Sequence, residues 1–436
     1  MPVKQIIFII VTLIALGVFA YSVSIIFKNI KFLKKAYPVN QHGKRIKRLF
    51  QIGFAQEKIL RFPLIGFLHA LVFWGFLAIT FGSFEMLLDG LTGQDRILKF
   101  FGFFYDFLIA TGDIFAFVIF ILIIIFLIRR YFMKIKRFQG VEMTHKAHKD
   151  AGFALLLILL LMLSLQLMNM AYVSLNPNNQ IGVYPVSKYL SVLFNGISND
   201  KLKIILEANW WIHIILIFFF ANYLPYSKHF HVFMSLPNVY LSRLTPLTQM
   251  TNMESVTNEV KLMLDPNAPI DDNINDSEIE RFGLKDVEDG TWKNYTDSLT
   301  CTQCGRCTSV CPANITGKLL SPRKIMIDFR ARMNEKSPGI RKKGKTYNDN
   351  KSLLRDYISE EEIWACTTCN ACAQECPVNI DHPSLILEMR RYIFMEESKA
   401  PSLLNSMSTN IENNGAPWQY PPTDRLKWAE NLYINE

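Results

Sequence analysis

Five long apolar runs occupy the first 236 residues of the chain, whereas the rest mixes apolar and charged residues as soluble proteins do. A helix needs roughly 20 residues to cross a bilayer. The apolar runs therefore predict five membrane-spanning helices, at residues 6–27, 62–88, 105–128, 151–172 and 204–223. No small-residue cleavage site follows the first run. Four lysines, at positions 28, 31, 34 and 35, follow it instead and indicate a retained anchor.

The region after residue 236 has the pattern of a soluble domain. Residues 322–334 and 383–397 have helical character. The chain is therefore predicted to be all-α, with a transmembrane domain at 1–236, a linker at 237–290, a helical domain at 291–400 and a C-terminal tail at 401–436.

The net charge of +9 comes largely from lysines and arginines in the loops between the apolar runs. The loops 28–61 and 129–149 carry ten and seven of them, whereas 89–104 and 173–203 carry two and three. Because basic loops stay on the cytoplasmic side, the N-terminus is predicted to lie outside and residues after 223 inside. We expect a multi-pass protein of the inner (cytoplasmic) membrane of a bacterium, in contact with lipid and not with nucleic acid.

All eight cysteines fall in two short runs, at 301–311 and 366–376. Each run reads C-x2-C-x2-C-x3-C-P, the spacing of bacterial ferredoxins. Three closely spaced thiolates hold three corners of a cubane cluster, and the fourth ligates the other cluster of the pair. Thiols clustered in this way also indicate a reducing compartment, which agrees with the cytoplasmic placement.

We therefore predict two [4Fe–4S] clusters with exchanged fourth ligands. One set of ligands is Cys301, Cys304, Cys307 and Cys376, and the other is Cys366, Cys369, Cys372 and Cys311. Structural zinc is the alternative, but zinc sites commonly use paired C-x2-C knuckles. Because the spacer between the runs is much longer than in a minimal ferredoxin, we expect a helical two-cluster (dicluster) ferredoxin module, not a small β-rich ferredoxin.

Several histidines lie where polar groups are costly. His69 is near the inner end of the second span, His213 is in the outer part of the fifth, and His229 and His231 follow that span on the inner side. We predict haem b held by His69 with His229 or His231; a satisfied buried histidine is the alternative for each. A second haem would need a partner for His213, and the outer half of the second span has no histidine. A quinone contact or proton relay is the other role for His213.

Helical geometry bears on this pairing. His213 and His231 are eighteen residues apart, five turns of a straight helix, and would share a face. Pro225 is expected to kink the segment between them. His145 and His148, just before the fourth span, are further candidates on the inner side.

These features resemble two groups of proteins. The membrane half resembles the cytochrome b subunit of respiratory nitrate reductase, with five spans and histidines in the second and fifth. The segments RFPLIGFLH at 61–69 and YSKHFH at 226–231 look like membrane-bound iron–sulfur oxidoreductases related to heterodisulfide reductase. In that group a cytochrome b region is fused to a helical two-cluster module. The resemblance implies electron transfer from a partner such as electron-transfer flavoprotein to menaquinone.

Long members of the group continue into a region with Cys-Cys-Gly motifs. This chain has no adjacent cysteine pair and stops at Glu436, after a segment at 413–418 that resembles the linker into that region. The resemblance therefore predicts a split system with a separate Cys-Cys-Gly-domain iron–sulfur protein. A flavin dehydrogenase is a further candidate partner.

The sequence favours an electron-transfer subunit of a membrane-bound quinone oxidoreductase, with no bond-making catalytic residue in this chain. The alternatives are a membrane-anchored iron–sulfur redox sensor and a ferredoxin module anchored by inert helices. Neither requires haem or quinone.

Overall fold

The computed structural model describes residues 2–265, 281–430 and 432, so the predicted linker and tail lie partly outside the described residues. The described residues form helices without any strand beyond two isolated bridges, which confirms the all-α prediction. The α-helices are α1 Val3–Ile30, α2 His42–Arg48, α3 Glu57–Leu60, α4 Pro63–Thr92, α5 Phe103–Tyr131, α6 His145–Leu175, α7 Pro185–Leu190, α8 Asn199–Tyr223, α9 His231–Tyr240, α10 Glu254–Leu264, α11 Trp292–Thr300, α12 Arg306–Ser309, α13 Pro312–Ile315, α14 Pro322–Lys343, α15 Leu353–Asp356, α16 Glu360–Trp364, α17 Ala371–Glu375, α18 His382–Arg391 and α19 Ser402–Asn414.

Five of these helices are long and apolar enough to cross a membrane, and they coincide with the five predicted runs. They are α1, α4, α5, α6 and α8, and each is longer than its apolar run. The extra turns come from polar residues that continue or cap a helix. Thr144, for example, accepts a hydrogen bond from the backbone N–H of Ala147, so α6 begins at His145 and includes His148 in its first turn.

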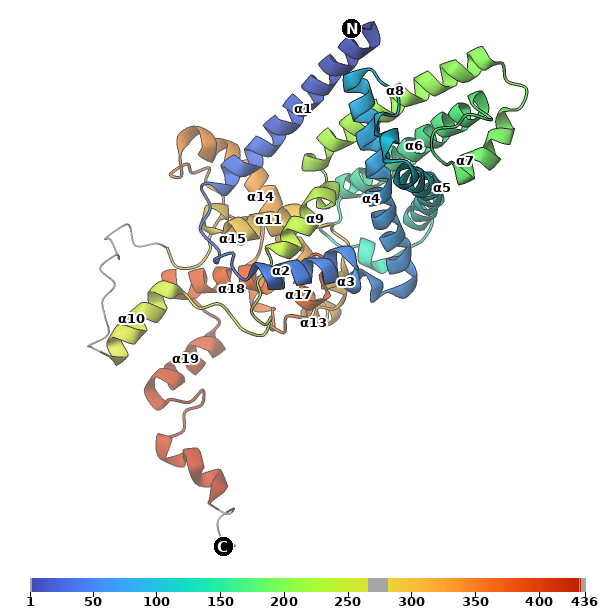
Figure 1. Cartoon of the computed structure of the whole chain (residues 1–436). Helices are drawn as coiled ribbons and strands as arrows, with labels where there is room; N and C mark the ends of the chain where they lie inside the picture. The colour runs from blue at the N-terminus through green and yellow to red at the C-terminus, as the bar shows by residue number, and fades with distance from the viewer. Residues whose placement is uncertain (1, 266–280, 431, 433–436) are drawn as a thin grey trace.

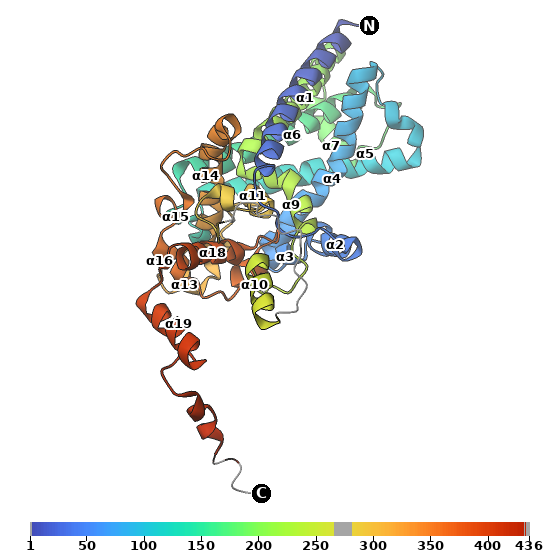
Figure 2. The ribbon, with the colours of Figure 1, turned by 90° about the vertical axis from the view of Figure 1, so that its left-hand side faces the viewer.

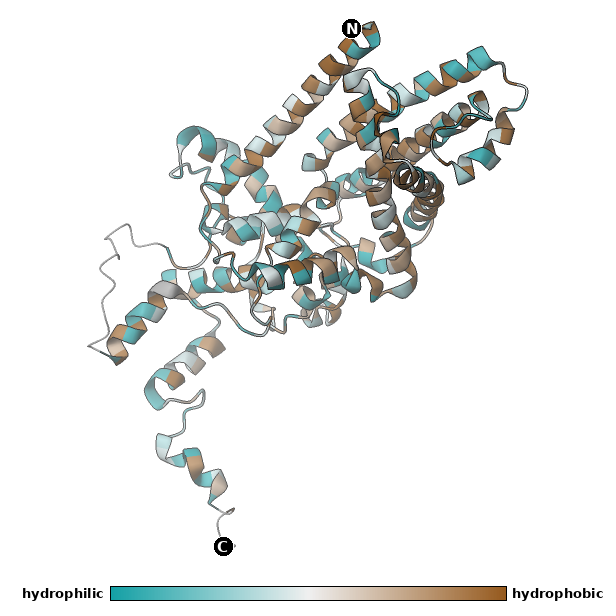
Figure 3. Cartoon of the chain, in the orientation of Figure 1, coloured by the Kyte–Doolittle hydropathy of each residue, from teal (hydrophilic) through white to brown (hydrophobic). Residues whose placement is uncertain are grey.

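Most residues of the spans are hydrophobic (Figure 3), and many of their side chains lie on the outer surface. Leu13 and Ile14 of α1 are more than half exposed, as are many large apolar side chains on the other spans. A continuous apolar surface of this extent is covered by lipid in a membrane protein.

The C-terminal domain is a cluster of short helices packed around α14, at the end of the spans away from the N-terminus (Figures 1 and 2). Its core is apolar and includes Leu284, Val287, Phe329, Met333, Leu385 and Ile393. Three side chains from the membrane half are buried in the same core, namely Phe32, Leu224 and Phe230. The two halves therefore share one hydrophobic core. The last helix, α19, extends away from it.

Polar contacts fix the same junction. Arg323 of α14 forms a buried ion pair with Glu142, 2.8 Å from Nε to Oε1, and donates to the backbone carbonyl of Gln139. Asn29 at the end of α1 donates to the Tyr295 hydroxyl at 3.0 Å. These contacts place both lysine- and arginine-rich loops on the side of the C-terminal domain. The side of the cell that this corresponds to stays a prediction.

Breaking the buried pair at this junction should destabilise it. We expect Glu142→Gln to cost about 3 kcal/mol, because it leaves the buried Arg323 guanidinium without its counter-charge. Thermal unfolding of the detergent-solubilised protein, followed by tryptophan fluorescence, measures the loss. Glu360→Gln is the control, since its pair with Arg355 is two-fifths exposed and should contribute at most about 1 kcal/mol. Equal losses for the two variants would contradict the expectation.

Candidate cofactor sites

The two cysteine runs fold into the same local structure. In the first, Gln303 and Gly305 have left-handed φ angles of 58° and 76°. In the second, Thr368 and Asn370 occupy the equivalent positions, at 55° and 60°. In each run the backbone therefore turns at two left-handed residues, and a short helix, α12 or α17, follows and contains the third cysteine. Gly305 is required because a Cβ there would lie 2.4 Å from the Arg137 carbonyl oxygen.

The two runs lie together so that the last cysteine of each is next to the first three cysteines of the other. Cys301, Cys304, Cys307 and Cys376 line one small cavity. Cys366, Cys311 and Cys369 lie close enough to Cys372 to raise the pKa of its thiol. The structure therefore brings together the two sets of four thiols that the motif predicts. Among the described residues, no three Cys, His, Asp or Glu side chains are placed to hold a single metal ion.

The chemistry of these thiols fits a metal cluster. Burial raises the pKa of Cys301 to about 11 and that of Cys376 to about 12. Buried thiols of this kind give up their protons when a metal takes the charge. A cubane needs one thiolate at each of four corners, and each set supplies four.

The two thiol sets differ in exposure. Of the first set, only Cys304 is half-buried and the other three are buried. In the second set, Cys369 is exposed and Cys366 is half-buried. The second set therefore reaches the surface at Cys369, whereas the first set is more buried and contacts the membrane half through Lys58.

Positive side chains surround the first set. Lys58 donates from Nζ to the carbonyl oxygens of Cys376, at 3.1 Å, and Ala373, at 3.4 Å. Arg306 donates back to the carbonyl of Lys58 at 2.8 Å. Burial lowers the pKa of Lys58, and the nearby Cys376 opposes that effect.

One residue of the first cavity could not be found from the motif. His382, at the start of α18, lines this cavity and is 1% exposed. Its Nδ1 is buried without a hydrogen-bond partner. The only sequence signal was its position six residues after Cys376.

The histidines of the inner side come together where the spans meet the C-terminal domain. His69, in the second turn of α4, has a buried Nδ1 without a hydrogen-bond partner. It lies close enough to His231 and Arg306 to interact with both electrostatically. His231 bonds through Nδ1 to the Lys228 carbonyl at 3.2 Å, which leaves Nε2 as the nitrogen with a free lone pair. Burial lowers the pKa of His231.

The prediction that His213 and His231 share one face of a helix is wrong. The helix α8 ends at Tyr223, Pro225 lies in the following turn, and His231 starts the new helix α9. The five-turn phase does not apply, because proline cannot continue the hydrogen-bond ladder. His213 is buried against α6, with Nδ1 3.0 Å from both the Ser164 hydroxyl and the Leu161 carbonyl oxygen.

The remaining candidates are more peripheral. The ring of His229 lies 5.8 Å from that of His231 and bonds to the Ser227 hydroxyl. His145 is exposed and His148 is half-buried, both in the first turn of α6. Neither is among the electrostatic neighbours of His69.

Comparisons with known proteins agree with the cysteine site. The family described as 4Fe-4S dicluster domain matches residues 293–377. The chain is 28% identical to a probable iron–sulfur-binding oxidoreductase, FadF, of Bacillus subtilis, over 98% of this chain and 61% of that protein. It is 28% identical to the EtfAB:quinone oxidoreductase of Syntrophomonas wolfei, over 90% of this chain and 55% of that protein.

A third relative belongs to the group expected from the sequence. It is one subunit of the ferredoxin/F(420)H(2)-dependent CoB-CoM heterodisulfide reductase of Methanosarcina acetivorans, 33% identical over 24% of this chain and 52% of that protein. No solved structure matches the chain. The likeness of the membrane half to the nitrate reductase cytochrome stays a prediction.

The chain spans about three-fifths of the length of the first two relatives. By name both relatives are oxidoreductases, the first of them iron–sulfur-binding, and the dicluster match contains both cysteine runs of this chain. The protein is therefore a chain with five membrane-type helices and a 4Fe-4S dicluster domain, similar to iron–sulfur oxidoreductases.

Proposed function

We propose that the chain is an electron-transfer subunit of a membrane-bound quinone oxidoreductase, between a cytoplasmic redox partner and menaquinone. One observation supports it above the others: Arg306 is an electrostatic neighbour of Cys304 and Cys376 and also of His69. The proposed cluster site therefore adjoins the proposed haem site. Bound there, two [4Fe–4S] clusters and haem b would supply one-electron chemistry.

Each group of residues has a role in this proposal. The two sets of four cysteines hold the clusters, and His69 with His231 holds haem b. The soluble partner would bind at the second set, where Cys369 is exposed, and the more buried first set would pass electrons to the membrane half. Lys58 and Arg306 stabilise negative charge at the first set.

The topology and partners follow from the same reasoning. We propose that the C-terminal domain and both basic loops are cytoplasmic and that the N-terminus is outside. The partner at Cys369 would be a Cys-Cys-Gly-domain iron–sulfur protein, electron-transfer flavoprotein or a flavin dehydrogenase. The name of the Syntrophomonas relative, EtfAB:quinone oxidoreductase, supports the flavoprotein.

The function is tested on the purified full-length protein. Dithionite should produce both iron–sulfur bleaching and the sharp band of a reduced b-type haem, and a water-soluble menaquinone analogue should then reoxidise both. Iron–sulfur bleaching without a haem band or quinone reactivity would overturn the proposal. It would favour the redox sensor or the anchored ferredoxin.

Lys58 should set the potential of the buried cluster. Lys58→Met removes a positive charge beside Cys376, so reduction becomes less favourable. We expect the midpoint potential of one cluster to fall by on the order of 50 mV, about 1 kcal/mol for one electron. A redox titration followed by electron paramagnetic resonance measures it. Lys58→Arg and the exposed Lys318→Met should leave both potentials in place; a fall in Lys318→Met of the same size would contradict a local effect.

A further inference from the structure

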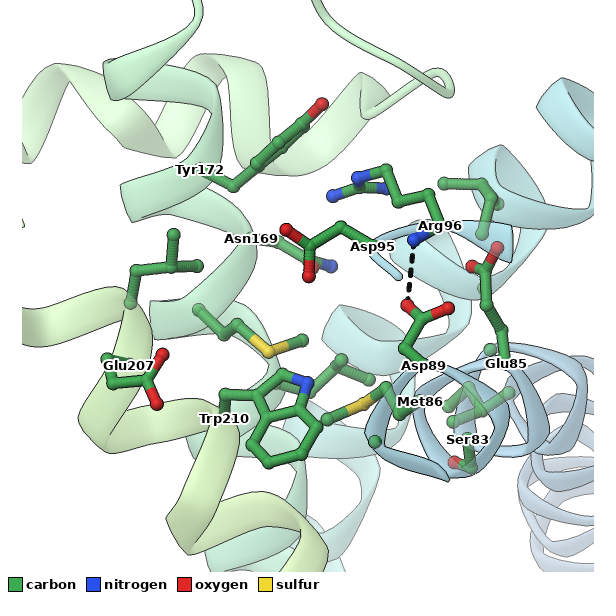
Figure 4. Close-up of a pocket in the computed structure, with 18 of the residues that line it drawn as sticks. Ser83, Glu85, Met86, Asp89, Asp95, Arg96, Asn169, Tyr172, Glu207 and Trp210 are labelled. Carbon is green, nitrogen blue, oxygen red and sulfur yellow. Dashed lines mark hydrogen bonds between the residues drawn. The ribbon is translucent and has the colours of Figure 1, made fainter. Parts of the chain in front are cut away.

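A cavity opens among the spans at the end away from the C-terminal domain (Figure 4). The N-terminal turn of α1, the outer halves of α4, α5 and α6, and the first half of α8 surround it. None of the predicted cluster or haem ligands lines it. It is therefore separate from the sites described above.

The wall of this cavity is largely apolar but includes the buried polar side chains Glu85, Asp113 and Asn169, and its rim is polar. Phe8, Ile79, Met86, Met168 and Trp210 form much of the wall. The rim carries Asp95, Arg96 and Glu207, of which the two carboxylates are exposed (Figure 4). A ligand that fits has a flat apolar body within the membrane and polar atoms at the aqueous edge.

Arg96 is the best-positioned hydrogen-bond donor at the rim. Its guanidinium stacks on the Tyr172 ring, 3.7 Å from the centroid, and its Nη1 donates to the hydroxyls of Tyr105, at 3.3 Å, and Tyr184. Asp89 accepts from the backbone N–H groups of Arg96 and Ile97 and so fixes this connection. Within the described part of the chain Arg96 forms no ion pair with a carboxylate. Among the described residues only Nη1 of this guanidinium donates, so Nε and Nη2 remain available to an acceptor oxygen.

Two glycines leave the interior of the cavity open. Gly82 of α4 and Gly112 of α5 both line it, and a Cβ at either would meet no atom within 4 Å. Glycine costs helix stability relative to alanine. Gly82 and Gly112 keep space in the middle of two spans without serving a tight helix–helix contact.

We propose that this cavity binds the headgroup of an isoprenoid quinone, with Arg96 donating to a quinone carbonyl oxygen. The inference rests on the proposed function, since it assigns that function its quinone site. Reduction of the bound quinone takes two electrons from the chain's redox centres and two protons from the water at the rim, and yields the quinol. Asp95 and Glu207 lie where those protons enter.

The test uses the purified full-length protein and a fluorescent quinone analogue, 2-heptyl-4-hydroxyquinoline N-oxide, whose emission is quenched on binding. Gly82→Leu fills the cavity, and we expect it to weaken binding about 10-fold or more. Gly17→Leu is the control, because Gly17 also has open space around it and lies outside the cavity. Arg96→Met should weaken binding by about 10-fold, because it removes one hydrogen bond from a charged donor. Lys99→Met, at an exposed position, should not weaken binding. Unchanged iron–sulfur absorbance shows that each variant is folded.

The outcomes separate the site from the function. The site would be overturned, and the function left standing, by two results together. Gly82→Leu and Arg96→Met would both bind the analogue as tightly as the unmutated protein, and the unmutated protein would still be reoxidised by the menaquinone analogue. An unmutated protein that neither binds the analogue nor is reoxidised would overturn both. Native mass spectrometry tests for bound phospholipid. If Gly82→Leu loses a phospholipid but still binds the analogue, the cavity is a lipid site and the inference is overturned.

Discussion

Replacing Cys376 with alanine should halve the iron and acid-labile sulfide of the purified protein, and the cluster lost should be the one held by the first cysteine run. Cys376 belongs to the second run in sequence, but it lines the cavity of Cys301, Cys304 and Cys307. Loss of one of four thiolates opens a corner of the cubane. Cys304→Ala should remove the same cluster and gives a second route to the same state.

The identity of the lost cluster can be read through Lys58. Lys58 touches the backbone of Cys376, so it should shift only the potential of the first cluster. In Cys376→Ala the surviving cluster should be insensitive to Lys58→Met, and in Cys311→Ala the survivor should respond. Cys304→Ala tests the exchange. Its surviving cluster should also be insensitive to Lys58→Met, whereas a survivor that responds would show that each run binds its own cluster. Iron analysis and electron paramagnetic resonance titrations measure both properties.

Replacing His69 with alanine should abolish the reduced b-type haem band while leaving the iron–sulfur content unchanged. In the proposed haem site His69 would supply one of the ligand nitrogens. Its buried Nδ1 has no hydrogen-bond partner within the described residues. His231→Ala should have the same effect, because His231 is the electrostatic neighbour of His69. The absorption spectrum of the dithionite-reduced protein measures this.

Two other histidines serve as controls for the haem. His145→Ala should retain the band, since His145 is exposed. His229→Ala should retain the band as well, whereas His231→Ala should lose it, so the two variants show which of these histidines binds the haem. Retention of full haem content in both His69→Ala and His231→Ala would contradict the site and leave the clusters as the cofactors of this chain.

The spans and the cysteine motif could be predicted because each depends on a local pattern. An apolar run of span length has few alternatives in water, and the C-x2-C-x2-C-x3-C-P spacing brings three thiols together by itself. Helix ends were less predictable. Thr144 starts α6 in a polar segment that hydropathy does not mark. Pro225 ended α8 outright, so helical phase could not be carried across it.

The surroundings of the cofactor sites could not be predicted, because they join residues far apart in the sequence. Lys58 meets Cys376 across 318 positions, and no local pattern encodes that contact. Glu85 is different: it is an ionisable residue inside a predicted span, which is a recognisable signal. It accepts from the Tyr105 hydroxyl at 3.0 Å and lines the outer cavity.

The burial of Phe32, Leu224 and Phe230 in the core of the C-terminal domain has a kinetic consequence. A ferredoxin on a flexible tether must collide with its acceptor at every turnover, and the viscosity of the medium limits that search. Here the donor and acceptor positions are set when the chain folds. Electron passage across this junction should therefore not depend on viscosity, and only the encounter with the soluble partner at Cys369 should be diffusional.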